Sequence, residues 1–447
     1  MSTLMRERLE SKGIEYKVYP CRQDLSACVG FSSKRLVSAY LNVGGRKVQL
    51  IFPASSMLDI KRCSSIYGES VKLMPRERVE SQISERLGTS VLPDFILRLG
   101  GFETVVDQAV SSMSRIDILQ EDGSMLRISG AELWDSLPDE SRGGELTIPV
   151  ANYMESVLAK DSLLKHKARD QVDSCTEFPA FPSTAMQIVR LRMDIDAGVT
   201  ELSDLLRSDG PLSAQIVGWA SSSYYAANGG VAGIEDAISR VLGFDQVINL
   251  SMHLAIHKQF NFEDNEVLSK YWRESIMTAI VAEMVAKKID MPEGATAGLC
   301  YLLGLLHNFG DLLVAECFEN EYHRIEELVL ENPHLPRGII QAAIMHTTRG
   351  QVGSWLCRNW SLPEVICQGI ALVDTPEQEG SDPAAVHMSK VVRLAKAILF
   401  NLDMSKEAPE KDDKLNVSLG VQPVNIMEIK EAIRKKAPEI EELTKLA

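Results

Sequence analysis

The stretch GLLHNFGDLL, residues 304–313, decides how the second half of this chain is interpreted. Leucines at helical spacing surround an adjacent polar pair, His307 and Asn308, which predicts a buried helix with polar groups at one point. A histidine beside an aspartate would offer a metal ion an imidazole nitrogen and a bridging carboxylate. Asn308 offers only a neutral carbonyl oxygen, which cannot bridge two metal ions or offset their charge. The stretch therefore has the pattern of a metal site that has lost its metal chemistry.

The sequence on both sides of this stretch is helical. From Ser183 onward strand signals are nearly absent, and Trp272, Ile276, Ile280 and Met284 recur on one stripe of a long helix. Further helices are predicted at residues 298–317, 337–359, 385–402 and 424–436. We therefore predict an all-α domain over residues 178–403, followed by a C-terminal loop and helix at residues 404–447 that pack on it or extend it.

Several segments of this half resemble the HDOD family, the non-catalytic relative of the HD and HD-GYP phosphohydrolases. FPAFPSTAMQIVRL (178–191) is similar to the segment that opens the family's domain. LSDLLRSDGPLSAQIVGWASSSYY (202–225) and IEDAISRVLGFDQVINL (234–250) resemble its next two segments, and IMHTTRGQVGSWLCRNWSLPEVI (344–366) resembles a later one. The resemblance implies an all-helical HDOD domain that acts in signal transduction or regulation.

The catalytic HD pattern implies where metal ligands would fall in this sequence. The degenerate positions are Glu274, His307, Asn308, His346 and Lys396. Only His307 and His346 keep the histidine that the pattern asks for. A later His-His pair has become Val373-Asp374, and a lysine at position 396 would repel a cation. We therefore expect no metal and no cofactor.

Two alternatives concern the remaining histidines. His307, His346 and Glu274 could together hold one Zn²⁺ or Fe²⁺ in a surviving phosphohydrolase. The other interpretation makes His307 and His346 hydrogen-bonded histidines of the helical core. His253 and His257 share a helix face four residues apart, a geometry that can bind zinc, but no third ligand follows, so we predict a surface or partner-contact role for them. Trp219 is expected to pack in the core rather than to form part of a ligand cage.

Residues 1–155 mix strand and helix patterns, which indicates a compact α+β domain. A short helix is closed by Gly13, and β-rich runs meet at Gly44-Gly45 and at Asp122-Gly123, both hairpin signals. Residues 156–177 are polar and charged and end at FPAFP, which predicts a linker. The predicted fold is therefore multidomain, a mixed-sheet α+β domain followed by an all-α domain.

The α+β half resembles the YbaK/prolyl-tRNA synthetase-associated family of aminoacyl-tRNA deacylases. SKRLVSAYLNVGGRKVQLIFPASSMLDIKRCSSIYG (33–68) is similar to the family's central hairpin and helix, and VVDQAVSSMSRIDILQEDGSMLRISGAEL (105–133) to its closing part. The family's orienting lysine falls on Lys34, and its neighbouring threonine is Arg35. The glycine-rich loop has become GTSVLPDFILRLGG, with Asp94 where it would oppose an oxyanion.

These departures predict that the deacylase motif is degenerate. Lys34, Arg35 and Asp94 become candidate ligand-binding residues, and a tRNA end or a small anionic ligand is the expected occupant. The alternative is a trans-editing aminoacyl-tRNA deacylase that uses Lys34 as its catalytic group.

Composition limits the remaining function classes. The 447 residues carry a net charge of −15, which argues against general nucleic-acid binding, although residues 1–80 hold 14 Lys and Arg against 8 Asp and Glu. The N-terminus is charged rather than signal-like, and the cysteines lack CxxC spacing, so they are expected to be reduced. We therefore predict a cytoplasmic bacterial regulatory protein that is not an enzyme. It is expected to bind a protein partner through its HDOD domain and not to bind a membrane.

Overall fold

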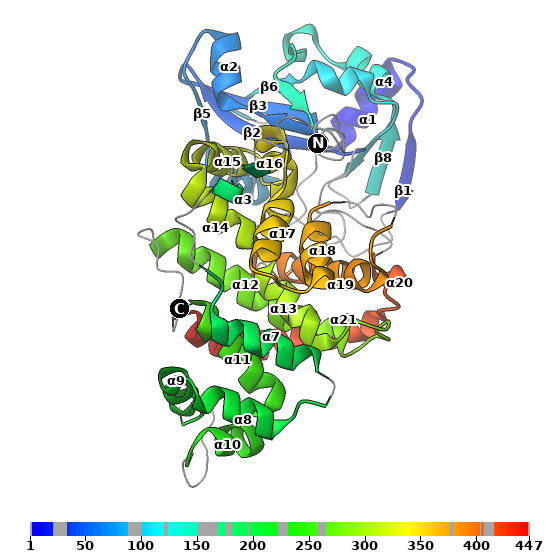
Figure 1. The fold of residues 1–447 in the computed structure, drawn as a ribbon. Helices are drawn as coiled ribbons and strands as arrows, with labels where there is room; N and C mark the ends of the chain where they lie inside the picture. Colours follow the sequence, from blue (N-terminus) through cyan, green and yellow to red (C-terminus); the bar gives the residue numbers. More distant parts are fainter. Residues whose placement is uncertain are drawn as a thin grey trace. The chain divides into compact units, whose positions relative to one another are not determined.

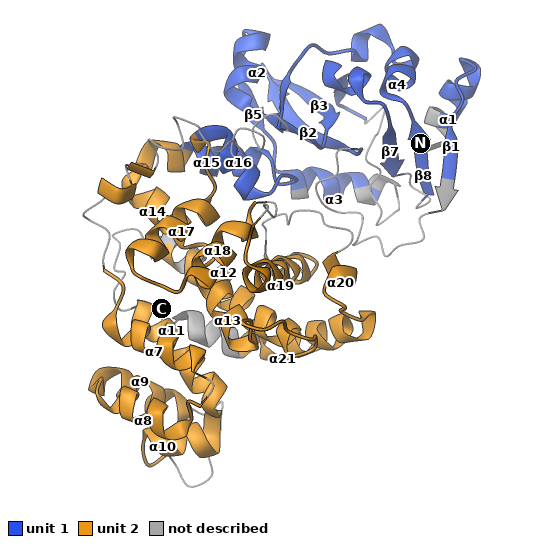
Figure 2. Ribbon diagram, turned by 45° about the vertical axis from the view of Figure 1, so that its right-hand side comes forward, with its two compact units in different colours: residues 1–159, 324–344, 407–411 blue, residues 160–323, 345–406, 412–447 orange. Residues whose placement is uncertain are grey.

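The computed structural model describes most of the chain and divides it into two compact units (Figures 1 and 2). The described residues are 2–20, 34–87, 100–119, 124–150, 169–170, 172–174, 180–194, 196–221, 231–257, 265–375, 380–402, 404–405 and 415–445. Unit 1 comprises residues 1–159, 324–344 and 407–411. Unit 2 comprises residues 160–323, 345–406 and 412–447.

Unit 1 is built on mixed β-sheets, which confirms an α+β fold for the first half. Its central sheet has the strand order β5-β2-β3-β6, with β3 and β6 parallel and the other pairs antiparallel. A second sheet has the order β1-β8-β7, and β4 pairs with β9. The strands are β1 (Lys17–Pro20), β2 (Leu36–Val43), β3 (Arg46–Pro53), β4 (Ser56–Leu58), β5 (Val71–Leu73), β6 (Glu103–Val106), β7 (Ile116–Leu119), β8 (Ser124–Ile128) and β9 (Thr147–Pro149).

Turn chemistry explains the predicted hairpins of unit 1. Gly44 and Gly45 both have positive φ, 55° and 92°, as the tight turn between β2 and β3 requires. The second hairpin, β7 with β8, is confirmed by its pairing, although its turn lies outside the described residues. The helices of the first 159 residues are α1 (Ser2–Ser11), α2 (Ile60–Tyr67), α3 (Arg76–Leu87) and α4 (Gly130–Ser136). Alternating apolar side chains of β2 and β3, among them Leu41, Val48 and Leu50, form much of the core.

Unit 1 also contains a segment from the predicted helical domain. Residues 324–344 include the end of α15 (Glu319–Glu331) and most of α16 (Arg337–Met345). Buried Asn332 binds β4 like a strand neighbour, because its Oδ1 accepts from Leu58 N at 2.6 Å and its Nδ2 donates to Leu58 O at 2.8 Å. His334 donates to Ser56 O at 3.1 Å, and Ile60 N donates to the Glu331 carboxylate at 3.0 Å. The compact unit is therefore discontinuous in sequence, which the pattern of residues 1–155 does not indicate.

Unit 2 is helical throughout its described part, as the HDOD resemblance predicts. The long helix α12 packs against α13, α19 and α21, and α18 packs against α17 and α19 (Figure 1). Its helices are α7 (Ser183–Met193), α8 (Val199–Arg207), α9 (Gly210–Ala220), α10 (Ile234–Asp236), α11 (Phe244–His257), α12 (Asn265–Ala286), α13 (Ala297–Leu306), α14 (Phe309–Cys317), α17 (Arg349–Asn359), α18 (Glu364–Val373), α19 (Pro383–Phe400), α20 (Leu415–Ser418) and α21 (Pro423–Lys445). Trp272 and Ile276 of the predicted stripe are fully buried on α12. An all-α description therefore fits this unit but not the whole chain.

Two helices that the sequence predicts as continuous are interrupted. The predicted helix 298–317 breaks at His307 and Asn308 into α13 and α14. The predicted helix 337–359 breaks after Met345, where His346 has a φ of +54° and Thr348 caps the N-terminus of α17. A histidine at positive φ cannot continue a right-handed helix. Both breaks fall at candidate metal positions.

The most apolar stretch of the chain lies inside unit 2. Ala297–Cys317 is long and apolar enough to cross a membrane by length and composition, but 83% of that window is buried in the protein. Such burial is typical of a core segment. Cys63, Cys300, Cys357 and Cys367 are buried free thiols, whereas Cys317 is disulfide-bonded, so the expectation of reduced cysteines is wrong at that position.

Candidate functional site

A buried ion-pair cluster occupies the region that the sequence marks as a degenerate metal site. The Arg349 guanidinium, with no exposed side-chain surface, donates to Asp374 through Nε at 3.0 Å and Nη2 at 3.4 Å. Its Nη1 lies 3.1 Å from Oδ2 of Asp311. The Lys396 ammonium, 13% exposed, lies 3.5 Å from Oδ1 of Asp374. We call Asp311, Arg349, Asp374 and Lys396 the Arg349 cluster.

Local sequence brings the members of the Arg349 cluster together. The Thr348 hydroxyl accepts from Gln351 N, and Gln351 Oε1 accepts from Thr348 N, so this capping box makes Thr348 the N-cap of α17, which begins at Arg349. Gly310 lets α14 approach α17, because a Cβ there would lie 2.0 Å from Arg349 O. Gly350 does the same against α18, where a Cβ would lie 2.6 Å from Ile370 O. The glycines hold the guanidinium between Asp311 of α14 and Asp374, which caps the end of α18.

His307 is a core histidine at the end of α13. It is 1% exposed, and its Nδ1–H donates to Gly304 O at 2.6 Å. Burial, with the cations Lys396 and Arg349 nearby, lowers the pKa of His307 to about 3, so its ring is neutral at pH 7. This placement favours the core interpretation of His307 over a ligand role.

The charges of the Arg349 cluster argue against a metal ion in the same place. Two cations, Arg349 and Lys396, balance two carboxylates, Asp311 and Asp374. A divalent cation would add two charges to a buried region without a compensating anion, and burying uncompensated charge costs several kcal/mol. Among the described residues, no three His, Cys, Asp or Glu side chains are grouped to hold a metal ion. The residues present therefore do not fit the dinuclear centre of the catalytic relatives.

The structure places the other predicted ligands as follows. Glu274 is half-buried on α12, and His346 is half-buried at the break between α16 and α17. Asn308 is 2% exposed, and its Oδ1 has no hydrogen-bond partner among the described residues. The Lys396 ammonium contacts Asp374. Arg349 and Asp311 were not anticipated from the sequence, in which Arg349 stands among the polar residues Thr347, Thr348 and Gln351 and nothing indicates that it is buried.

The N-terminal candidates are only partly described. Lys34 is exposed in the turn before β2, and its carbonyl accepts from Asp117 N at 2.8 Å. Arg35 is half-buried, with its carbonyl accepting from Ala54 N at 2.9 Å. Asp94 lies outside the described residues. Nearby on β7, burial alone would raise the pKa of Asp117, but bonds from Arg115 and Arg127 outweigh it and lower that pKa.

One expectation about the histidines of α11 is wrong. His253 was predicted to lie at the surface, but it is 2% exposed. Its ring packs edge-on against the Trp272 ring, with the ring centroids 4.9 Å apart. Every residue of α11 from Val247 to Ile256 is buried, His253 and the other polar ones included, which the mixed composition of FDQVINLSMHLAIH does not indicate. Trp219, expected in the core, is half-buried.

The helical region matches a known family. A family model described as the HDOD domain matches residues 178–376, so the chain contains an HDOD domain over these residues. A solved structure from Marinobacter aquaeolei VT8, whose name proposes a signal transduction protein, is 25% identical, with a TM-score of 0.75 and coverage of 99% of both chains.

Two further relatives share a smaller part of the chain. An HDOD domain protein with unknown function from Geobacter sulfurreducens is 24% identical and covers 63% of this chain and 97% of its own, with a TM-score of 0.51, which shows the fold alone. An uncharacterized protein from Treponema pallidum (strain Nichols) is 22% identical over 198 residues. The chain spans 38% of the length of that curated relative.

Proposed function

We propose that this chain is a non-enzymatic bacterial regulatory protein, in which an HDOD domain with a degenerate metal site serves as the output domain. The observation that carries this proposal is the Arg349 cluster. A guanidinium and an ammonium group pair with the buried carboxylates Asp311 and Asp374 next to His307, so these carboxylates do not supply uncompensated negative charge for a metal ion. The name of the Marinobacter aquaeolei protein, which aligns over nearly the whole chain, points in the same direction.

The HDOD domain is proposed to act by binding a protein partner. Large apolar side chains are exposed on the C-terminal helices α20 and α21 of unit 2, namely Val417, Val424 and Met427 with exposures of 81%, 57% and 71%. Val424 and Met427 are three residues apart on α21, so they share one helix face. Neighbouring exposed apolar groups of this kind support a protein contact.

The N-terminal domain is proposed to be a degenerate editing-type ligand-binding domain of residues 1–155, joined through a linker at residues 156–177. Its mixed sheet and the exposed Lys34 support a site for a tRNA end or a small anionic ligand near Lys34, Arg35 and Asp94. Lys61, on α2 of the same unit, is not included in this site, because its ammonium group pairs with Glu327 at 2.7 Å. A cytoplasmic location is part of the same proposal.

Metal content and hydrolysis test the proposed loss of phosphohydrolase activity. Full-length protein is incubated with Mn²⁺, Fe²⁺ or Zn²⁺, desalted, and analysed for bound metal and for hydrolysis of phosphomonoesters and cyclic dinucleotides. We expect less than stoichiometric metal and no turnover. About one equivalent of metal that disappears in a His307→Ala, His346→Ala double variant would overturn the proposal in favour of the surviving phosphohydrolase.

Deacylation of mischarged tRNA tests the other enzymatic alternative. Wild type and Lys34→Ala are compared, with Lys72→Ala as the matched control, because Lys72 is exposed on β5 of the same unit. We expect no turnover above background in any of the three. Turnover that falls roughly a hundredfold in Lys34→Ala but not in Lys72→Ala would identify a trans-editing deacylase instead.

A further inference from the structure

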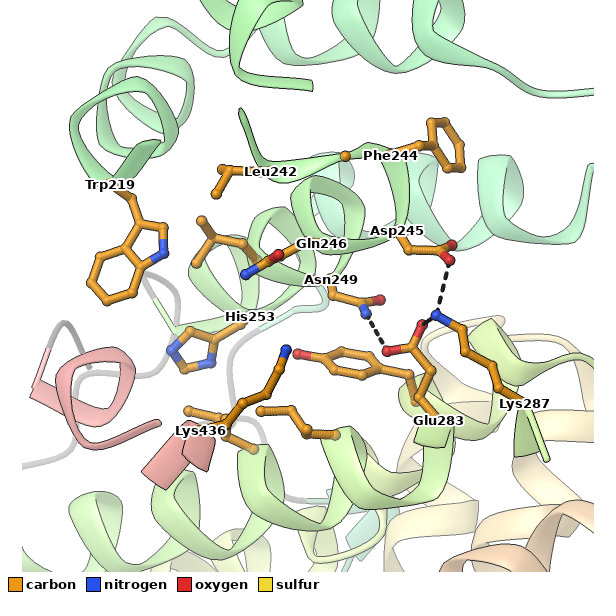
Figure 3. Close-up of a pocket in the computed structure, with 15 residues that line it drawn as sticks. Trp219, Leu242, Phe244, Asp245, Gln246, Asn249, His253, Glu283, Lys287 and Lys436 are labelled. Atoms are coloured by element: carbon orange, nitrogen blue, oxygen red, sulfur yellow. Dashed lines mark hydrogen bonds and ion pairs between the residues drawn. The ribbon is translucent and has the colours of Figure 1, made fainter. Parts of the chain in front are cut away.

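Unit 2 contains a cavity of about 490 Å³ that shares no residue with the Arg349 cluster (Figure 3). Its walls come from α9, the start and middle of α11, α12, α13 and α21. The volume falls within the range of small-molecule sites, about 300–1,000 Å³. The cavity is therefore large enough for a small aromatic ligand rather than for a single water molecule.

His253 is an unsatisfied polar group on the wall of this cavity. It is 2% exposed, and neither Nδ1 nor Nε2 has a hydrogen-bond partner among the described residues. Burial, and then the neighbouring His257, lowers the pKa of His253 to about 3, so the ring is neutral and offers one N–H donor and one acceptor. An unpaired buried polar group destabilises the folded protein, and a ligand that bonds to it would remove that cost.

The charged groups at the other end of the cavity are mutually paired. Glu283 accepts from Asn249 Nδ2 at 3.0 Å and pairs with Lys287 at 3.0 Å. Lys287 and Arg192 both bind Asp245, at 3.1 and 3.0 Å, and Arg192 also lies 3.6 Å from Glu283. Asp245, Glu283 and Lys287 thus line this end of the cavity as mutually paired charges, with Arg192 bound to them from outside the lining.

The remaining lining is mostly apolar and aromatic, with the Gln246 amide, the Tyr301 phenol and one further cation. Ile276 and Ile280 of α12 supply apolar surface, and Trp219 of α9 supplies an indole ring. Lys436 of α21 brings an ammonium group to the same space, and Figure 3 shows Trp219, His253 and Lys436 directed into it. An aromatic face, an apolar wall and a cation together favour a planar ring that carries an acid group.

The backbone next to the cavity is irregular. Residues Ala237–Leu242 form a π-helical turn, and Gly243, which lines the cavity, has a φ of +86°. A π-helical turn is a rare feature that is found disproportionately at functional sites. The π-helical turn follows α10, and Gly243 separates it from α11, which begins at Phe244 beside the cavity.

We propose that this cavity binds a small aromatic molecule with one acidic group. Its ring lies between Trp219 and the isoleucines of α12, a polar edge bonds to His253, and the acid pairs with Lys436. The proposal is independent of whether the Arg349 cluster excludes metal, because it concerns other side chains.

The probe is 1-anilinonaphthalene-8-sulfonate, an aromatic amine with one sulfonate, titrated into the full chain by fluorescence and calorimetry. N-phenyl-1-naphthylamine, which lacks the sulfonate, is the matched neutral probe. We expect one sulfonate probe per chain and about tenfold weaker binding of the neutral probe, a loss that corresponds to about 1.4 kcal/mol. Lys436→Met should weaken the sulfonate probe about tenfold and leave the neutral probe unchanged.

Three further variants make the result decisive. Lys435→Met, at a 74% exposed side chain on the same helix, should bind both probes as wild type does. Ile280→Trp should fill the cavity and abolish binding of both, and His253→Phe should weaken both by several-fold. Absence of binding in wild type, several probes per chain, or equal binding by Ile280→Trp would overturn the proposal. If Ile280→Trp fails to fold, equal loss of the two probes in Lys436→Met would overturn it instead.

Discussion

Two buried histidines of unit 2, His307 and His253, make an instructive comparison. Both are nearly inaccessible, and burial lowers the pKa of each to about 3. The ring of His307 donates to Gly304 O and lies in a closed region where all four charges of the Arg349 cluster are paired. The ring of His253 faces a cavity of about 490 Å³ with no partner among the described residues.

The difference teaches that a recognisable motif and an available site are separate properties. The sequence draws attention to His307 because of its neighbours Asn308 and Gly310. The structure pairs the His307 ring and the four charges of the Arg349 cluster, and paired polar groups have little to gain from a ligand. His253 lies outside the family's catalytic pattern, yet its nitrogens retain hydrogen-bonding capacity beside a cavity. The unpaired ring nitrogens of His253 and the cavity beside them, rather than a family resemblance, indicate a binding site there.

The largest expected effect comes from breaking the Arg349 cluster. Asp374→Ala leaves Arg349 and Lys396 buried with one counter-charge fewer, and we expect the free energy of unfolding to fall by about 3–5 kcal/mol. Urea unfolding followed by circular dichroism measures it. Glu364→Ala is the control, because the Glu364–Arg358 pair is 55% and 39% exposed and should contribute less than about 1 kcal/mol. Equal, small losses in both variants would mean that the cluster is not a balanced buried network.

Acid should destabilise both histidine regions. The folded pKa of each ring, about 3, lies below the unfolded value near 6.5, so the unfolded chain takes up the proton first. The contribution of the two buried histidines to the free energy of unfolding is complete above pH 6.5. It is lost as the pH falls, by on the order of 2 kcal/mol per histidine at pH 5. Urea midpoints at pH 7 and pH 5 measure the loss. His307→Leu and His253→Phe should each reduce this pH dependence, and an unchanged dependence in either variant would contradict the assignment for that ring.

Replacing His307 alone should destabilise the protein at pH 7. His307→Leu removes the donor to Gly304 O and leaves that carbonyl without this bond, a change that costs about 1–3 kcal/mol. Thermal and urea unfolding at pH 7 measure the change. His323→Leu is the control, since the side chain of His323 is 71% exposed and should be near neutral. No loss in His307→Leu would show that its hydrogen bond adds nothing to stability.

Replacing His253 should have the smallest effect and the opposite sign. His253→Phe keeps a flat ring against Trp272 but removes two unsatisfied nitrogens, so we expect stability at pH 7 to rise by about 1 kcal/mol. The same variant should bind the sulfonate probe more weakly. Gain of stability with loss of binding is the pattern expected of a ligand site. A clear loss of stability would place His253 among the satisfied core histidines, like His307.

Much of the fold follows from local sequence patterns. Gly13 and Gly44-Gly45 end or turn their segments as predicted, since positive φ is readily adopted only by glycine. The stripe of Trp272 and Ile276 placed α12 in the core. The break at His346 was missed, because nothing in the apolar pattern of residues 337–359 marks a histidine at positive φ. Likewise Asn332, which binds β4, is 274 residues from its partner Leu58, a distance over which periodicity carries no information.

Residue patterns alone were enough to predict the mixed-sheet first half and the helical second half with its HDOD segments, and the family resemblance predicts that metal-binding residue types are missing at positions 274, 308 and 396. These properties depend on composition, periodicity and motif order, which are local. Three features became visible only in three dimensions: Arg349 pairs with Asp311 and Asp374, residues 324–344 belong to unit 1, and His253 faces a cavity. Ion pairing, strand capping and cavities depend on which distant side chains meet, and packing in three dimensions alone sets those meetings.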